Sequence, residues 1–416
     1  MPDTRSPQPP APAPAPRRAW QQLRASDLRA AARLATQATT GVTHIVEGVH
    51  QSVHASLGLR GSAPGRTGGL TGLVYRGVRG TTRWIDAGLQ AALGRLEPWL
   101  ERVLHAAPGE VDVEREAVLS ALNGVLGDRL QADDNPLALP MLLRQQGQPL
   151  DPLALHAAGQ ASGKLLLLVH GLCMNDLQWT QGGHDHGAHL ARTLGYTPVY
   201  LRYNSGRHVS DNARDLAERL EALLAAWPVS VQEFSAIGHS MGGLVLRGAV
   251  HWARGQRQRW PAQLRRLVFL GTPHLGAPLE RAGHGIDLLL ASNPYSRPFV
   301  HLARLRSAGI TDLRHGHVRE SDWRAPDRRA APVPLPAGVA CYAVAAALAE
   351  RHCGLADRLL GDGLVPLNSA LGRHDTPARG LAFPPAHCHV AWQLGHLALL
   401  GDAAVADRLV QWLGAN

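Results

Sequence analysis

Lysine is almost absent from this sequence, because Lys164 is the only one among 416 residues. Arginine therefore carries nearly all of the positive charge, and the formal net charge is +9. Residues 1–100 hold twelve arginines against five acidic residues, which is +7 of that total, so the rest of the chain is close to neutral. A protein that binds nucleic acid through its folded domain is expected to carry a basic groove there. The charge distribution gives no such groove, and we predict no nucleic-acid partner.

Cysteines and long apolar runs are also scarce. The four cysteines show neither C-x-x-C spacing nor the density of a disulfide framework, which favours a reducing compartment. No stretch is long and apolar enough to cross a bilayer, and residues 1–20 lack the apolar core of a signal peptide. These absences predict a cytoplasmic protein, either free or bound peripherally at the inner membrane surface.

The N-terminal quarter differs from the rest of the chain in composition. Residues 1–16 are rich in proline and alanine and predict an extended, disordered tail. Residues 17–110 carry apolar side chains every three or four positions, which predicts an amphipathic helical region. One predicted helical face carries three arginines, namely Arg76, Arg79 and Arg83. Two alternatives stay open: peripheral contact with a membrane through residues 17–105, or packing of these helices on the remainder of the protein.

The sequence pattern changes after residue 160. Residues 111–160 predict one helix, over residues 113–130, and then a connector interrupted by prolines. Residues 161–416 alternate strands with helices, which predicts an α/β domain with a mostly parallel sheet and helices on both faces. The predicted strands are residues 165–169, 197–201, 231–237, 267–270, 339–345 and 388–393. Residues 279–335 interrupt this alternation without strand character, and we expect an inserted lid there.

The segment Gly238-His239-Ser240-Met241-Gly242-Gly243 lies between a predicted strand and an apolar helix. A serine at the tip of a strand–turn–helix is a nucleophile elbow. Its backbone is strained, and glycines two residues before and after it leave room for the close turn. The helix that begins near Met241 directs its first N–H groups toward the serine, so the Met241 N–H is a candidate oxyanion donor. A plain glycine-rich turn is the alternative, but the flanking strand and helix favour the elbow.

A serine nucleophile needs a base, and the base needs a carboxylate that orients it. In this kind of sheet the chain order is serine, acid, histidine. This order favours Asp362, in the tight turn Gly361-Asp362-Gly363, as the acid and His396, after the last predicted strand, as the base. The rival acids are Asp357 and Asp375, and the rival bases are His387 and His389.

Further candidate site residues follow two other predicted strands. The segment His170-Gly171-Leu172 ends the first apolar strand, and its glycine lets the Leu172 N–H serve as the second oxyanion donor. The turn that begins Gly271-Thr272-Pro273-His274 either borders the acyl or leaving-group pocket or is a plain strand-end turn. The predicted pocket residues are His170, Gly171, His239, Thr272 and His274.

Three closely spaced histidines raise the question of a metal site. They are His184, His186 and His189, with H-x-H-x-x-H spacing. No further run of ligands accompanies them, and we therefore predict no bound metal.

The segments HGLCMN, GHSMGG, GTPHLGAP, GDGLVP and GHLALL together resemble the α/β-hydrolase superfamily over residues 163–416. Within it they are similar to the lipase branch related to GPI inositol-deacylases and triacylglycerol lipases. The resemblance implies an α/β-hydrolase fold and no cofactor. It also implies Ser240 as nucleophile, Asp362 as acid, His396 as base and the N–H groups of Leu172 and Met241 as oxyanion donors. The N-terminal 110 residues depart from it and look like an accessory segment of some bacterial members.

These observations predict a serine carboxylic-ester hydrolase that acts on a small-molecule acyl or lipid-like ester through an acyl-enzyme. Two alternatives remain. The same triad can transfer the acyl group to an alcohol or thiol, which makes an acyltransferase. The domain can also be a non-catalytic scaffold at a membrane surface or on a partner protein, although a full triad argues against this.

Overall fold

The computed structural model describes residues 113–277, 306–324, 332–350 and 361–415. The chain divides into two units, Met1–Glu110 and Val111–Asn416, and all described residues belong to the second. The predicted tail, the predicted N-terminal helical region and most of the predicted lid lie outside the described residues.

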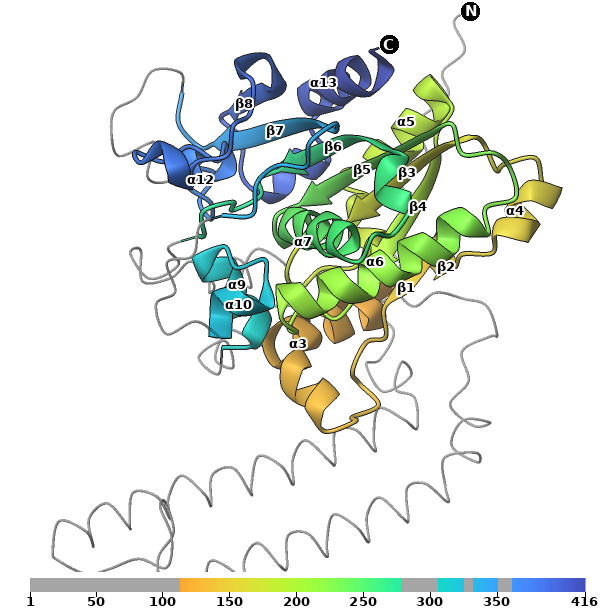
Figure 1. Ribbon diagram of the computed structural model, residues 1–416, viewed down its shortest axis with the longest axis horizontal. Coiled ribbons are helices and arrows are strands. Elements are labelled where there is room, and N and C mark those ends of the chain that lie inside the picture. The colour runs from red at the N-terminus through yellow and green to blue at the C-terminus, as the bar shows by residue number, and fades with distance from the viewer. Residues whose placement is uncertain (1–112, 278–305, 325–331, 351–360, 416) are drawn as a thin grey trace, which may run out of the picture. The chain divides into compact units, whose positions relative to one another are not determined.

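An eight-stranded sheet forms the centre of the described fold, in the order β2-β1-β4-β3-β5-β6-β7-β8 (Figure 1). Strands β3 to β8 pair in parallel, whereas β1 runs antiparallel to both of its neighbours. The strands are β1 (Leu142–Gln145), β2 (Gln148–Pro149), β3 (Lys164–Val169), β4 (Thr197–Arg202), β5 (Glu233–His239), β6 (Leu264–Leu270), β7 (Ala340–Ala347) and β8 (Cys388–Trp392). The predicted mostly parallel sheet is confirmed. With a serine turn directly after its central strand β5, it is an α/β-hydrolase fold.

Helices cover both faces of the sheet, as parallel strands require. In Figure 1, α6 and α7 lie on one side of the sheet, and α5 and α13 lie on the other. The helices are α3 (Val113–Ala132), α4 (Pro152–Ala157), α5 (His186–Leu194), α6 (Val209–Ala225), α7 (Met241–Gly255), α9 (Ala308–His315), α10 (Glu320–Arg324), α12 (Leu367–Ala370) and α13 (Ala403–Gly414). Short 3₁₀ helices are η2 (Asp176–Trp179), η3 (Trp260–Ala262), η5 (Pro377–Arg379), η6 (Pro385–His387) and η7 (Leu397–Leu400).

Strand β3 is buried on both faces, which its uninterrupted apolar run predicted. Leu166 and Leu168 belong to a core cluster with Leu190 of α5 and Trp412 of α13. Successive side chains of a strand point to opposite faces, so the equally buried Leu167 faces the other helix layer. Burial of each such side chain stabilises the fold by about 2 kcal/mol. The sheet is thus fixed at the strand that leads into the site.

The sheet begins earlier in the chain than the sequence predicted. Residues expected to form a connector form the hairpin β1–β2, and β1 pairs with β4 through Leu143 and Leu201. The turn residues Gln146 and Gly147 have φ of 51° and 75°, as a two-residue type I′ turn requires. Glutamine is not one of the residues that signal this turn, and strands of four and two residues are too short to show alternation. The hairpin therefore left no clear sequence signal.

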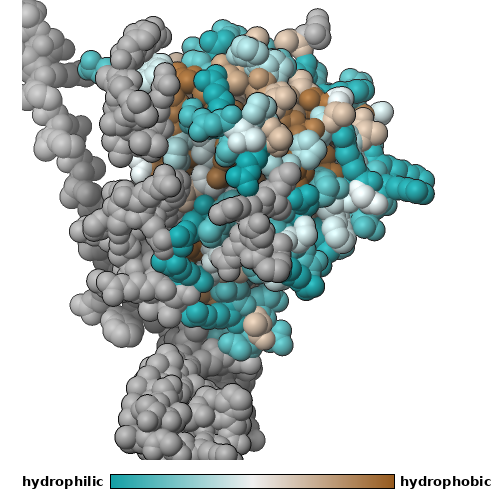
Figure 2. Space-filling model, turned by 60° about the vertical axis from the view of Figure 1, so that its left-hand side comes forward, coloured by the Kyte–Doolittle hydropathy of each residue, from teal (hydrophilic) through white to brown (hydrophobic). Residues whose placement is uncertain are grey.

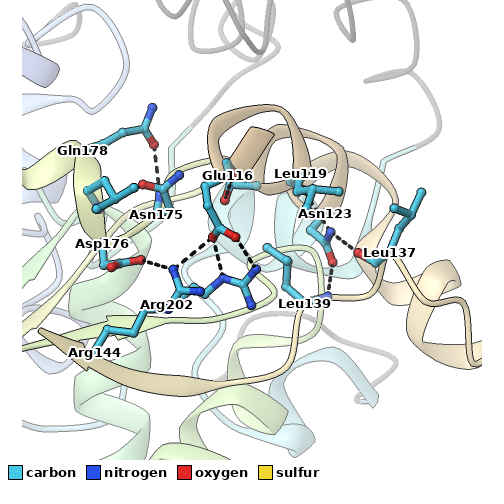
Figure 3. A network of polar contacts seen from close by, with 12 residues as sticks. Glu116, Leu119, Asn123, Leu137, Leu139, Arg144, Asn175, Asp176, Gln178 and Arg202 are labelled. Carbon is cyan, nitrogen blue, oxygen red and sulfur yellow. Dashed lines mark hydrogen bonds and ion pairs between the residues drawn. The ribbon is translucent and has the colours of Figure 1, made fainter. Parts of the chain in front are cut away.

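Helix α3 is joined to the sheet by a buried network of charges (Figure 3). Glu116 accepts hydrogen bonds from Arg202 Nε, at 2.8 Å, and from Arg144 Nη1, at 3.0 Å. Arg144 Nη1 also lies 3.2 Å from Asp176 Oδ1 of η2. The network connects α3, β1, β4 and the segment after β3, so α3 belongs to the same folded unit as the sheet.

Residues 306–324 of the predicted lid contain α9 and α10 and pack on the rest of the unit. Ser307 Oγ donates to the Gly124 carbonyl at 2.7 Å, and the Ala308 N–H donates to Asp128 Oδ2 at 2.9 Å, both on α3. The buried Asp312 accepts the Val209 N–H at 2.8 Å, at the first turn of α6. Lid motion stays a prediction, because most of the segment lies outside the described residues.

No helix within the described ranges has both the length and the apolar character needed to cross a bilayer. On the face drawn in Figure 2, hydrophobic patches lie among hydrophilic residues.

Candidate active site

Ser240 lies at the turn between β5 and α7, with φ of 53° and ψ of −124°. A positive φ is strained for a residue with a side chain. A Cβ on Gly238 would lie 2.6 Å from Gly243 Cα, and a Cβ on Gly242 would lie 2.2 Å from the Val169 carbonyl oxygen. The predicted reason for these glycines is confirmed, since no side chain fits at either position.

The loop after β3, residues 170–175, is called the HG loop below, and it lies against this turn. A Cβ on Gly171 would lie 3.0 Å from Ser240 Cβ. The His170 ring stacks on Tyr203, with ring centroids 4.4 Å apart, and Tyr203 Oη donates to the His170 carbonyl at 2.9 Å. Burial lowers the pKa of His170 to about 3, so the ring is neutral. The HG loop is therefore fixed beside Ser240.

The two candidate oxyanion donors come from these two segments. Met241 is the first residue of α7, and the first N–H groups of a helix have no intrahelical acceptor. Leu172 follows Gly171 directly in the HG loop. The structure brings both backbone segments to the Ser240 turn. Their role as oxyanion donors stays a prediction.

Asp362 and His396 form a buried pair. His396 Nδ1 lies 2.6 Å from Asp362 Oδ2, and the two side chains are 3% and 0% exposed. The other carboxylate oxygen accepts the N–H groups of Leu364, at 3.0 Å, and Val365, at 2.8 Å. These bonds fix the carboxylate, and the carboxylate fixes the imidazole ring. Because Nδ1 donates to the carboxylate, Nε2 is the ring nitrogen left for proton transfer.

This pair is connected to the Ser240 turn through His239. His239 Nε2 donates to the His396 carbonyl at 3.2 Å, and the two ring centroids are 4.7 Å apart. Burial, followed by the charge of His396, lowers the pKa of His239 well below its usual value, so His239 is neutral. The turn after β6 also lies close to the His396 ring, because a Cβ on Gly271 would lie 3.1 Å from His396 Nδ1. The sequence predicted His239 as a pocket residue. Its position next to Ser240 did not indicate that its ring would contact His396.

The rival residues that the structure describes occupy other environments. Asp375 is exposed, and Asp357 lies outside the described residues. His389 lies within β8, and His387 Nδ1 bonds the Cys341 carbonyl at 3.0 Å. Among the described candidates, the structure pairs His396 with Asp362.

The turn after β6 packs against the first half of α7, next to the Ser240 turn. A Cβ on Gly243 would lie 2.0 Å from Thr272 Oγ1, and His274 Nδ1 accepts from Arg247 Nη1 at 2.9 Å. Burial, followed by the charge of Arg247, lowers the pKa of His274 well below its usual value. Both Thr272 and His274 are fully buried. Their contacts with Gly243 and Arg247 hold the turn after β6 against α7. Contact of these side chains with substrate stays a prediction. Sequence reasoning missed Arg247, because a charged residue in an apolar helix normally faces solvent.

Two of the three closely spaced histidines, His184 and His186, are joined by a hydrogen bond. His184 Nε2 lies 2.9 Å from His186 Nδ1, and His186 Nε2 lies 2.9 Å from the Leu399 carbonyl. No group of three or more His, Cys, Asp or Glu residues in the described part of the chain is arranged to hold a metal ion. The ring nitrogens of His186 are thus engaged by protein atoms.

Comparison with known proteins gives partial matches. A family described as a domain of unknown function (DUF7379) matches residues 144–293, which is less than half of the chain. No curated protein matches the sequence.

Solved structures similar to this chain include hydrolases. Lipase BlEst2 of Bacillus licheniformis, in its mature form, is 16% identical, with a TM-score of 0.40 over 66% of this chain and 97% of that one. The metagenomic carboxyl esterase MGS0156 is 18% identical, with a TM-score of 0.35 over 70% and 86%. Phospholipase PlaB from Legionella pneumophila is 17% identical, with a TM-score of 0.34 over 50% and 45%. Likenesses of this degree carry no argument about chemistry, which rests on the residues of this chain. The resemblance to GPI inositol-deacylases stays a prediction.

Proposed function

We propose that this protein is a serine carboxylic-ester hydrolase that acts on an acyl or lipid-like ester. The observation that carries the proposal is the buried pair of His396 and Asp362, 2.6 Å apart, which His239 connects to the strained Ser240 turn. A strained serine, a histidine held by a carboxylate and a helix N-terminus at one point are the parts that acyl transfer needs.

In the proposed reaction, Ser240 Oγ attacks the ester carbonyl carbon while His396 Nε2 takes the hydroxyl proton. The N–H groups of Leu172 and Met241 stabilise the oxyanion that forms. His396 then gives the proton to the departing alcohol, which leaves an acyl group on Ser240. Water attacks this acyl-enzyme with His396 again as base, and the carboxylic acid leaves as Ser240 recovers its proton. Asp362 stays ionised throughout and stabilises the imidazolium.

Replacement of Ser240 tests the proposal. We expect Ser240→Ala to lower kcat for p-nitrophenyl esters by about 10⁴-fold or more, because loss of the nucleophile removes the acyl-enzyme route. Ser235→Ala is the matched control, since Ser235 is a buried serine of β5, the strand that leads into the Ser240 turn, five residues earlier. It should keep most of the activity. Unchanged activity in a folded Ser240→Ala protein would contradict the proposal.

The substrate class is tested with the wild-type protein. A series of p-nitrophenyl esters of increasing chain length gives the preferred acyl group. Product analysis with an added alcohol separates hydrolysis from acyl transfer. We expect the free carboxylic acid as the main product, and an alkyl ester as the main product would indicate an acyltransferase.

We further propose that residues 17–105, which lie outside the described part of the chain, contact an anionic membrane peripherally. Each arginine near such a surface contributes about 1 kcal/mol. Arg76, Arg79 and Arg83 together would give about 3 kcal/mol, or roughly a hundredfold in partitioning. Co-sedimentation with anionic liposomes should fall when salt is raised and fall again when the three arginines are replaced by alanine. No sedimentation at low salt with anionic lipid present would overturn this proposal.

A further inference from the structure

Helix α3 contacts the HG loop through its backbone. A Cβ on Gly124 would lie 2.1 Å from Cys173 Sγ and 2.9 Å from both Cys173 N and Cα. Cys173, the residue after Leu172, has φ of 60°, which is uncommon for a residue with a side chain. Its N–H donates to Ser205 Oγ at 3.0 Å. The backbone next to the proposed oxyanion donor is therefore held between α3 and the loop after β4.

The same helix contacts the loop after β4 one turn further on. A Cβ on Gly127 would lie 1.8 Å from Asn204 Oδ1, and Asn204 Nδ2 donates to the Gly127 carbonyl at 2.9 Å. Glycine inside a helix is unfavourable relative to alanine. Gly124 and Gly127 are therefore best explained by the two close contacts that they permit.

The segment that follows Leu172 is also held at a second point, Asp176, by an ion pair (Figure 3). Asp176, four residues after Leu172, lies 3.2 Å from Arg144 Nη1, and that nitrogen lies 3.0 Å from Glu116 Oε2 of α3. Burial raises the pKa of Asp176 even though Arg144 opposes the shift. Burial would also raise the pKa of Glu116, but the charges of Arg202 and Arg144 outweigh it and lower that pKa. Glu116 is thus held as the anion that positions Arg144.

We infer that α3 positions the Leu172 N–H for oxyanion binding, with Gly124 and Glu116 as positioning residues that act through Cys173 and Asp176. The inference rests on the proposed function. Glu116 and Gly124 are eight residues apart, or about 12 Å along the helix, so α3 fixes the segment after Leu172 at two separate points. Oxyanion donors work at about 2.7–3.1 Å from the developing charge, and a displacement of about 1 Å in a site costs about 10²-fold in rate. A methyl group at Gly124 would force a displacement of that order.

The test compares two glycines of the same helix. We expect Gly124→Ala to lower kcat for a p-nitrophenyl ester about 10²-fold, with KM changed less than about threefold, because oxyanion stabilisation acts in the transition state. Gly127→Ala is the matched control: its methyl group also clashes, but with the Asn204 side chain and not with the HG loop. The Gly127→Ala protein should unfold at a lower urea concentration than the wild type, and its kcat should be unchanged. Adding Cys173→Gly to Gly124→Ala removes the nearest clashing atom and should restore part of kcat.

An inhibitor supplies an independent readout. A trifluoromethyl ketone forms a hemiketal with a serine nucleophile, and its oxygen occupies the oxyanion site. Its affinity should fall in Gly124→Ala in parallel with kcat/KM. Should Gly124→Ala not fold, Asp176→Asn, which keeps the side-chain shape, is expected to lower kcat about tenfold with KM unchanged.

The outcomes separate a failure of the inference about α3 from a failure of the proposed function. A folded Gly124→Ala protein with wild-type kcat overturns the inference about α3 alone, as does an equal loss of kcat in Gly127→Ala. For a Gly124→Ala protein that does not fold, unchanged kcat in Asp176→Asn does the same. Absence of any Ser240-dependent hydrolysis in the wild-type protein overturns the proposed function and the inference together.

Discussion

The two halves of the candidate site are held by different forces. In the nucleophile half, which is Ser240 with the HG loop, backbone packs directly on backbone, and added Cβ atoms on Gly238 or Gly242 would lie within 2.6 Å of other backbone atoms. In the acid–base half, which is Asp362 and His396 with their loops, directional hydrogen bonds to one carboxylate fix the geometry. The first half excludes extra atoms, whereas the second requires particular polar atoms. Substitutions that add volume and substitutions that remove polarity should therefore affect the halves differently.

The largest effect is expected in the acid–base half. We predict that His396→Ala lowers kcat roughly 10⁴- to 10⁶-fold, because it removes the base from the serine. His387→Ala and His389→Ala are the controls and should keep most of the activity, since one bonds the Cys341 carbonyl and the other lies within β8. Steady-state kinetics of the three purified proteins check this. An inactive His389→Ala protein together with an active His396→Ala protein would show that the base is His389 of β8.

A smaller loss is expected at the acid. Asp362→Asn keeps the side-chain shape but no longer stabilises an imidazolium, so we predict a loss of roughly 10⁴-fold in kcat. The exposed Asp375 supplies the control, and Asp375→Asn should be nearly as active as the wild type. Equal activities for the two variants would remove Asp362 from the proposed triad.

The nucleophile half is tested by added volume. Gly238→Ala places a methyl group 2.6 Å from Gly243 Cα, and we predict a loss of about 3 kcal/mol in the free energy of unfolding. Gly255→Ala, at the end of α7, the helix that follows the turn, meets no atom within 4 Å and should be neutral or slightly stabilising. Urea unfolding of both variants measures this contrast. A Gly238→Ala protein as stable as Gly255→Ala would show that the turn has room to adjust.

The smallest predicted effect is a dependence of stability on pH. Burial lowers the pKa of His170 to about 3 and that of His186 to about 4, and it lowers those of His239 and His274 in the same direction. The unfolded chain binds protons at these residues first, near pH 6.5, so their contribution to stability is present above that pH and falls below it.

At pH 5.5 the loss is about 1 kcal/mol for each of His170 and His186. His208 acts in the opposite sense: burial lowers its pKa, but Asp312 outweighs burial and raises it, so its contribution is present at low pH and lost as pH rises. Urea unfolding at pH 7.5 and 5.5 should show lower stability at pH 5.5. Equal or higher stability at pH 5.5 would contradict the buried, neutral state of these rings.

The difference between the halves also decides what the sequence could predict. A turn this tight requires glycines at fixed positions. The spacing of Gly238, Ser240 and Gly242 therefore predicted a nucleophile elbow. A hydrogen-bonded pair requires only an aspartate and a histidine on suitable loops, and the chain offers several of each. The strands followed from their apolar runs, because burial on both faces leaves a strong pattern. The choice of Asp362 and His396 rested on chain order, on their places after predicted strands and, for Asp362, on its flanking glycines.

Other features left little signal. The hairpin β1–β2 has a Gln146-Gly147 turn and too few residues to alternate. The contact of α3 with the HG loop joins Gly124 and Cys173, which are far apart in sequence. A glycine inside a predicted helix indicates close packing but does not name the partner. Contacts of this kind depend on how elements pack, which local sequence patterns do not encode.

The most direct test of the central claim, that His396 held by Asp362 activates Ser240, is the rate at which a fluorophosphonate labels the protein. Mass spectrometry should find one adduct on the wild-type protein, on the peptide that contains Ser240. Labelling should be slowed by several orders of magnitude in His396→Ala, because an unactivated serine is a poor nucleophile. An adduct on another residue, or equal labelling rates in the wild type and His396→Ala, would contradict the account.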